Sequence, residues 1–356
     1  MKKVLPKYPI FIPSKGRHDV DLTMKFMDAD GVPFRLVVEP QDRDDYARKY
    51  GAKRVLVLPE NDRGLPYSRN WIKALAADEG HFRHWQIDDN ISGIWRWFRG
   101  HRLYCSAGVA LRASEDFTDR YENVAISGLN YVMFAMDATK PFNLNVHVYS
   151  CTLVRTDLQN RFRGPNEDVD MCLQVLADGW CTILFNAFLV QKLGTMIVKG
   201  GQTDFEYYGD GRLKMARDLQ RRWPGVVTTG RRWGRPQHVV SNQWRKFDNK
   251  LVPKKGLRVS NGVDEYGMKL VQKKEIKSDR IRKLLTGAPQ RRKEERQETN
   301  RPKKRHDAES ARPSTKGKRK SARSVRNLRE DGSEAIASSR GSKVSQECIA
   351  DKKMER

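Results

Sequence analysis

Short apolar segments alternate with segments of helical periodicity along this chain. The apolar segments are nearly continuous, which is typical of strands that are covered on both faces. Strands that alternate with helices pack as a mainly parallel sheet with helices on both sides. The sequence therefore predicts an α/β fold. We expect strands at residues 8–12, 34–38, 54–58, 84–88, 123–127, 146–154 and 181–185, and helices at residues 21–29, 43–50, 65–77 and 166–177.

Charge and aromatic residues are distributed unevenly. The formal net charge of the 356 residues is +25, and more than half of this excess lies in residues 251–356. All eight Trp precede position 245, and Tyr266 is the only aromatic residue after position 250. Because a core needs large apolar side chains, we expect residues 251–356 to be a basic, largely disordered tail. We assign residues 1–205 to the α/β domain and residues 206–250 to an Arg- and Trp-rich C-terminal part of it.

Several classes of protein are disfavoured by what the sequence lacks. No stretch reaches the roughly 18 apolar residues that cross a bilayer, and residues 1–8 lack the apolar run of a secretory signal. The five cysteines are odd in number and form no CxxC pair. That argues against a disulfide framework or a zinc site. We expect a cytoplasmic protein with reduced thiols and no membrane partner.

Two adjacent acids, Asp88 and Asp89, end the strand that begins at His84 and are followed by Asn90. Carboxylates are poor core residues, because burying an unpaired charge is costly. A hard divalent cation takes such oxygen ligands and keeps positions open for phosphates. Because Asp and Asn also initiate turns, a plain turn is the alternative interpretation.

Other strand ends are polar as well, namely residues 14–17, Glu39 and residues 59–64. Ligands of parallel α/β sheets bind beyond the carboxyl ends of the strands. We therefore predict that these segments gather with Asp88 and Asp89 along one edge of the sheet.

The segment Ser14-Lys15-Gly16-Arg17 follows the first strand, where backbone N–H groups and basic side chains can hold an anion. An ordinary solvated turn is the alternative. The chain has no GxxxxGK[ST] loop, which argues against an ATPase. Arg69 lies near the start of a predicted helix, and its guanidinium suits a diphosphate. Local pairing at the surface is the alternative for Arg69.

Three acids, Glu167, Asp168 and Asp170, open the predicted helix at residues 166–177. The helix dipole alone favours acids in a first turn, but three acids within four residues exceed what capping needs. Glu167 or Asp168 is therefore a candidate general base. His147 and His238 are potential ligands or bases, but isolated histidines are usually structural, and we favour that interpretation.

Cations and aromatic residues interleave between residues 217 and 245. Such a surface suits nucleic acid, where cations meet phosphates and aromatic faces stack on bases. A Trp-anchored subdomain with a solvated basic face is the alternative. The candidate nucleic-acid-binding residues are Arg231, Arg232, Trp233 and Arg235.

Together, these motifs resemble a GT-A glycosyltransferase in order and spacing. More narrowly, the segments IPSKGR, VVEP, LPENDRG, SRNWI, WQIDDNI and GPNEDVDM are similar to those of the TET-associated glycosyltransferases. These enzymes occur in phages and in eukaryotic relatives and are associated with glycosylation of hydroxymethylated pyrimidines in DNA. The resemblance covers about residues 8–205. It implies a GT-A-like nucleotide-sugar-binding fold with a mixed, mainly parallel sheet flanked by helices.

The resemblance also implies a reaction and a set of roles. A hexose would move from a UDP-sugar to a hydroxymethylated pyrimidine in DNA, with inversion and with help from Mn²⁺ or Mg²⁺. A phage-encoded protein would act in the host cytoplasm. The donor would contact Ser14, Lys15, Gly16, Arg17, Glu39, Arg69 and Asp88, the metal would bind Asp88 and Asp89, and Asp168 or Glu167 would deprotonate the acceptor.

One departure from the family pattern concerns the acids, which are adjacent here rather than separated by one residue. Which carboxylate contacts the metal is therefore open. Two alternatives also stay open at this point. One is the same fold acting on a protein or glycan acceptor. The other is a non-enzymatic nucleic-acid-binding protein whose acidic cluster is structural.

Overall fold

A computed structural model describes most of the chain up to residue 257. The described residues are 3–98, 101–135, 138, 140–193, 209–232, 234–240 and 243–257, with two further short strands, β13 (Gly262–Val263) and β14 (Lys269–Leu270). Trp233 and most of the predicted tail therefore lie outside the described residues. Within the described part, none of the helices has the length and apolar character needed to cross a membrane.

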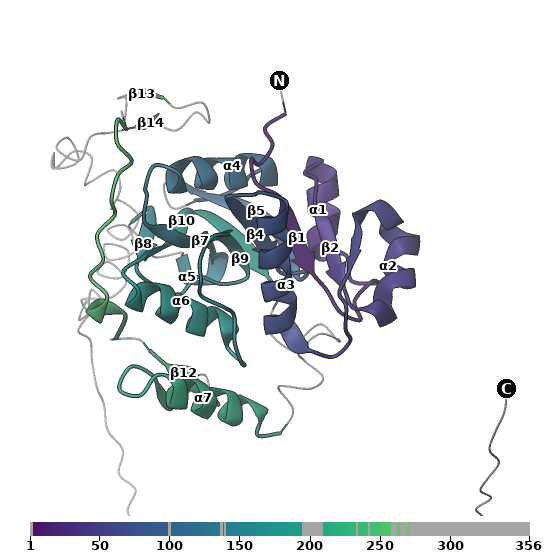
Figure 1. Ribbon diagram of the computed structural model, residues 1–356. Coiled ribbons are helices and arrows are strands. Elements are labelled where there is room, and N and C mark those ends of the chain that lie inside the picture. Colours follow the sequence, from purple (N-terminus) through teal and green to yellow (C-terminus); the bar gives the residue numbers. More distant parts are fainter. Residues whose placement is uncertain are drawn as a thin grey trace, which may run out of the picture. The chain divides into compact units, whose positions relative to one another are not determined.

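A ten-stranded mixed sheet forms the centre of the α/β unit (Figure 1), with strand order β3-β2-β1-β4-β9-β7-β10-β5-β6 and with β8 paired to β10. Strands β5, β8 and β9 run against the other seven. The strands are β1 (Ile10–Pro13), β2 (Arg35–Val38), β3 (Val55–Val57), β4 (Arg83–Ile87), β5 (Ile91–Phe98), β6 (His101–Tyr104), β7 (Val124–Tyr131), β8 (Phe142–Leu144), β9 (Cys151–Arg155) and β10 (Cys181–Lys192).

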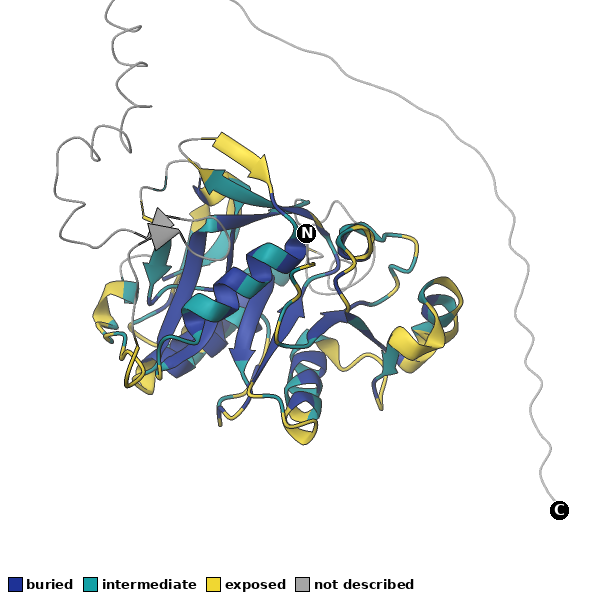
Figure 2. Cartoon of the chain, turned by 90° about the horizontal axis from the view of Figure 1, so that it is seen from above, coloured by how far each residue is buried: buried dark blue, intermediate teal, exposed yellow. Residues whose placement is uncertain are grey.

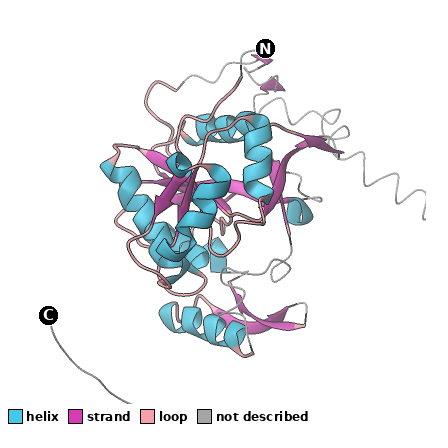
Figure 3. Ribbon diagram, turned by 90° about the vertical axis from the view of Figure 1, so that its right-hand side faces the viewer, coloured by secondary structure: helices cyan, strands magenta, loops and turns pink. Residues whose placement is uncertain are grey.

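Helices cover both faces of this sheet (Figure 3). Met24 and Met27 of α1 share one core cluster with Ile10 and Ile12, whereas Ile72 of α3 packs with Phe11 in another. Those helices and the others are α1 (Leu22–Asp30), α2 (Arg43–Tyr50), α3 (Gly64–Asp78), α4 (Ala107–Thr118), α5 (Val132–Ala135), α6 (Glu167–Ala177) and α7 (Gly211–Arg222), with 3₁₀ turns at Pro40–Asp42, Ala52–Arg54 and Gln243–Lys246.

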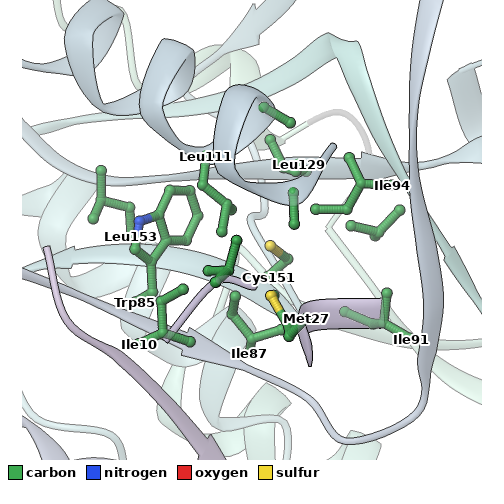
Figure 4. Packing of buried hydrophobic residues seen from close by; sticks show 14 of the residues in the cluster. Ile10, Met27, Trp85, Ile87, Ile91, Ile94, Leu111, Leu129, Cys151 and Leu153 are labelled. Carbon is green, nitrogen blue, oxygen red and sulfur yellow. The ribbon is translucent and has the colours of Figure 1, made fainter. Parts of the chain in front are cut away.

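The alternation of side chains along each strand explains why both faces are covered. In β1, Ile10 and Ile12 point to one face and Phe11 to the other, and all three are at most 2% exposed. A strand buried on both sides reads as a continuous apolar run, which is the pattern in the sequence. The central strands are accordingly buried throughout (Figure 2). Trp85 and Ile87 of β4 lie in the largest core cluster (Figure 4).

The predicted mixed α/β sheet with flanking helices is confirmed. The expected strand at 146–154 starts later, at Cys151, because Ser150 has a positive φ of 58° that interrupts extended backbone. The β5–β6 hairpin and α4 were not among the predicted elements.

The segment that begins at residue 209 packs on α6. Leu219 of α7 and Val227 share a core cluster with Val169 and Leu173 of α6. A two-stranded sheet of β11 (Thr228–Arg232) and β12 (Arg235–Val239) follows α7. The domain boundaries at residues 205 and 250 stay a prediction.

Candidate active site

The carboxyl end of β4 carries the two predicted acids, and Asp89 is held by the segment after β1. Ser14 donates its hydroxyl to Asp89 Oδ2 at 2.6 Å, and Arg17 Nη1 lies 2.9 Å from Asp89 Oδ1. Asp89 is only 5% exposed. Burial raises the pKa of Asp89, while the Arg17 cation opposes that shift. The structure thus brings the predicted strand ends 14–17 and 88–90 together.

Asp88 lies between two cations. Arg69 Nη2 is 3.1 Å from Asp88 Oδ1, and Lys192 Nζ is 2.7 Å from Asp88 Oδ2. Burial alone would raise the pKa of Asp88, but Lys192 and Arg69 together hold it below its ordinary value. Lys192, the last residue of β10, was not among the predicted site residues. No local motif marks it, since it is 104 residues from its partner.

Arg69 connects the end of β4 to the start of α6. Its side chain is 4% exposed, and its Nε donates to Glu167 Oε1 at 3.0 Å. Nη1 donates to Gln86 of β4 at 3.2 Å, so with Asp88 all three guanidinium nitrogens are bonded. Burial and the charge of Asp168 raise the pKa of Glu167 to about 7, against the attraction of Arg69. Arg69 therefore fixes the two acidic elements relative to each other.

Asp168 follows Glu167 in the first turn of α6 and is paired with a histidine. His147 Nε2 lies 3.0 Å from Asp168 Oδ2, and both side chains are partly exposed, at 26% and 29%. Burial would raise the pKa of Asp168, but His147 and Arg69 lower it. His147 also stacks on Trp244 with an interplanar angle of 5°. His147, interpreted as structural from sequence, thus contacts a candidate base.

Lys15 and Glu39 meet as an ion pair beside this edge. Lys15 Nζ is 2.9 Å from Glu39 Oε2 and also pairs with Asp62 in the loop after β3. Gly16 has a φ of 59°, a conformation that favours glycine, and its N–H donates to Asp42 at 2.9 Å. The predicted strand ends at 14–17, 39 and 59–64 are therefore adjacent.

Backbone strain is concentrated near these residues. Asp62, Ser150 and Asn166 have positive φ values of 57°, 58° and 57°. For residues other than glycine such conformations cost about 1–3 kcal/mol and persist where the surroundings enforce them, often at functional sites. Asp62 pairs with Lys15, and Asn166 immediately precedes the acids of α6.

The candidate nucleic-acid-binding residues lie apart from these acids in sequence. Arg231 and Arg232 are on β11 and Arg235 is on β12, and all three are exposed. The structure does not describe Trp233, so the predicted stacking residue lies outside the described part.

These acids and cations lie at the carboxyl edge of the sheet, where open α/β folds bind their ligands. The family model of the TET-associated glycosyltransferases matches residues 8–201, more than half of the chain. This protein belongs to that family and is a glycosyltransferase. A search of curated proteins found no match.

Two solved structures are similar to part of the chain. One is a putative nucleotide-diphospho-sugar transferase from Desulfovibrio desulfuricans, with 9% identity and a TM-score of 0.34 over 51% of this chain and 80% of that chain. The other is mannose-1-phosphate geranyltransferase from Thermus thermophilus, with 12% identity and a TM-score of 0.26 over 51% of this chain and 57% of that chain. At these TM-scores the likenesses carry no argument about substrate or mechanism.

Proposed function

We propose that this glycosyltransferase moves a hexose from a UDP-sugar onto the hydroxymethyl group of a modified pyrimidine in DNA. The observation that carries the proposal is the link made by Arg69. It joins Asp88, at the strand end where a donor diphosphate would bind, to Glu167, next to the candidate base Asp168. Family membership supports the acceptor class.

On the donor side, the segment from Ser14 to Arg17 and the Lys15–Glu39 pair would border the nucleotide. Arg69 is buried and each of its three guanidinium nitrogens already makes a bond, so we propose that it positions Asp88 rather than contacting phosphate itself. Asp88, at 18% exposure, is accessible to the donor.

On the acceptor side, we propose Asp168 as the general base. Its side chain is 29% exposed, whereas Glu167 is 5% exposed and accepts a bond from Arg69. The acceptor oxygen would attack the anomeric carbon while Asp168 takes its proton, and the bond from that carbon to the UDP oxygen would break. A base opposite the leaving group favours a single displacement with inversion.

A divalent cation was also predicted, at Asp88 and Asp89. Each of their four carboxylate oxygens already binds Arg69, Lys192, Arg17 or Ser14. Among the described residues, no group of three His, Cys, Asp or Glu side chains could hold a metal ion. In this arrangement the acids do not fit Mn²⁺ or Mg²⁺ unless some of these bonds rearrange, and the proposed reaction includes no step through a metal.

The DNA partner would contact residues outside this candidate active site as well as within it. We propose that Arg231, Arg232 and Arg235, with the basic residues 251–356, contact phosphates and raise affinity without reading sequence. A target base within a duplex would have to leave the stack to reach Asp168.

The proposal is tested by incubating the full chain with a panel of UDP-sugars and DNA containing hydroxymethylcytosine or hydroxymethyluracil. Nucleoside mass spectrometry should show the mass of one hexosyl group added to the modified base. Asp168→Asn is the matched control and should give about 10²–10⁴-fold less product. Transfer to protein or glycan, with no gain of mass on any DNA, would contradict the acceptor and point to the alternative substrate class.

A further inference from the structure

We infer that Lys192 and Asp88 form a diphosphate-binding site that needs no metal, in which the Lys192 ammonium neutralises the phosphates of the leaving nucleotide. This inference rests on the proposed function, and it names a charge that the sequence motifs did not identify. Four observations support it.

The first observation is where Lys192 lies. Strands β4, β7 and β10 run in the same direction, so the end of β10 reaches the same edge of the sheet as the end of β4. Lys192 is the last residue of β10, and Asp88 is the first residue after β4. The Nζ–Oδ2 distance of 2.7 Å shows that the two side chains meet there.

The second observation is a break in the pleat next to Lys192. Gln191 pairs with Gly93 of β5, but Lys192 pairs with Ile91, so Ser92 is an extra residue in β5. This is the pattern of a β-bulge, which re-aims side chains and is frequent near active sites. Lys192 also donates to Ser150 Oγ at 2.8 Å, and Ser150 is one of the strained positions, with a φ of 58°. The lysine therefore lies between the bulge against β5 and the residue that precedes β9.

The third observation is the local charge. Three cations, Arg17, Arg69 and Lys192, pair with three acids, Asp88, Asp89 and Glu167. The charges of this group balance when Glu167 is ionised. If Lys192 turns to a diphosphate, Asp88 still keeps Arg69 as its counter-charge, so the lysine can give its charge to the phosphates.

The fourth observation is accessibility. Arg69 is 4% exposed and its three nitrogens are bonded within the protein, whereas Lys192 is 18% exposed. The ammonium group of Lys192 has three N–H donors, two of which bond Asp88 and Ser150, and it would meet a phosphate as a point charge. Lys192 can thus contact a diphosphate while Asp88 keeps it oriented.

The test is calorimetric titration of the full chain with UDP, first in EDTA and then with Mn²⁺ or Mg²⁺. Wild-type protein should bind UDP in EDTA with an affinity that metal changes by less than about threefold. Lys192→Gln should weaken UDP binding about tenfold to a hundredfold, which is the loss expected for one charge-assisted hydrogen bond. Lys192→Arg should stay within about threefold of wild type.

Two controls separate a lost charge from a damaged fold. Uridine has no phosphates, so in a competition experiment Lys192→Gln and wild type should bind it with the same affinity. Structural damage would instead lower the affinity of the variant for both uridine and UDP. Lys53→Gln, at an exposed lysine after α2, should leave the affinities for UDP and for uridine unchanged.

The inference is overturned if wild-type protein binds UDP only with metal, or if Lys192→Gln binds UDP as tightly as wild type. The EDTA arm uses unaltered protein, so it tests whether the site needs a metal even if the Lys192 variants do not fold. No UDP binding by wild type in either buffer would instead overturn the proposed donor, and the inference with it.

Discussion

Replacing Arg69 with methionine should destabilise the fold, and the cost should increase with pH. Methionine approximates the volume of the arginine stem but removes the charge that compensates Glu167, which is 5% exposed. Breaking a buried ion pair by removing one partner costs about 3–5 kcal/mol. Asp88 keeps Lys192 as a partner, so the uncompensated group is Glu167.

The pH dependence follows from the direction of the Glu167 shift. Its pKa is about 7 in the folded protein and 4.5 ordinarily, so wild-type stability from this group is lost as pH rises from about 4.5 to 7. Without Arg69 the folded pKa rises further, and the loss of stability continues above pH 7. Near pH 5.5 Glu167 is protonated in both proteins. The cost there should fall to about 1–2 kcal/mol, from lost hydrogen bonds to Gln86 and Asp88.

Urea unfolding followed by tryptophan fluorescence at pH 5.5 and pH 8 measures this difference. Adding Glu167→Gln to Arg69→Met should recover most of the loss at pH 8, because no buried charge then remains unpaired. Arg63→Met, at an exposed arginine beside α3, should change stability by less than about 0.5 kcal/mol. An Arg69→Met cost below about 1 kcal/mol at pH 8, or an equal cost at both pH values, would refute the reasoning.

Three further outcomes are expected. Asp168→Asn should lower sugar transfer by about 10²–10⁴-fold in the mass-spectrometric assay while UDP affinity stays within about threefold; full activity would exclude it as the base. Gly128→Ala places a Cβ 2.3 Å from the Cys151 carbonyl oxygen. It should therefore lower the free energy of unfolding in urea by about 1–3 kcal/mol or more. Gly93→Ala is the control and should cost much less, because the nearest atom to its Cβ is 3.9 Å away. Deleting residues 271–356 should weaken DNA binding and flatten the slope of log affinity against log salt concentration; an unchanged slope would show that these residues make no phosphate contacts.

The strands of the first half could be predicted because burial on both faces leaves a continuous apolar run. The β5–β6 hairpin could not, since Ser92 and Gly93 interrupt that run and all four residues of β6 are exposed. Helix α4 gave a weak signal for a different reason. Much of its buried face is alanine, at positions 107, 110 and 113, which carries little apolar periodicity.

The donor side of the site could be predicted in part from strand ends alone. Ser14, Arg17 and Asp89 meet because parallel strands deliver their carboxyl ends to one edge. The Lys192–Asp88 pair could not be predicted this way, because it depends on a β-bulge and on the direction of β10 relative to β4. Such features arise from pairing between distant segments and leave no local pattern.

The bonds made by Arg69 give a reason for a buried cation at a position that an apolar residue could fill. A buried ion pair adds little net stability compared with well-packed apolar side chains. Its value here is positional, because one planar guanidinium bonds Asp88 through Nη2 and Glu167 through Nε, which fixes the end of β4 against the first turn of α6. If Asp88 faces the donor and Asp168 faces the acceptor, that fixed separation determines whether the two substrates meet in line. A lysine at position 69 would present a single point charge and could not hold both acids in this planar geometry.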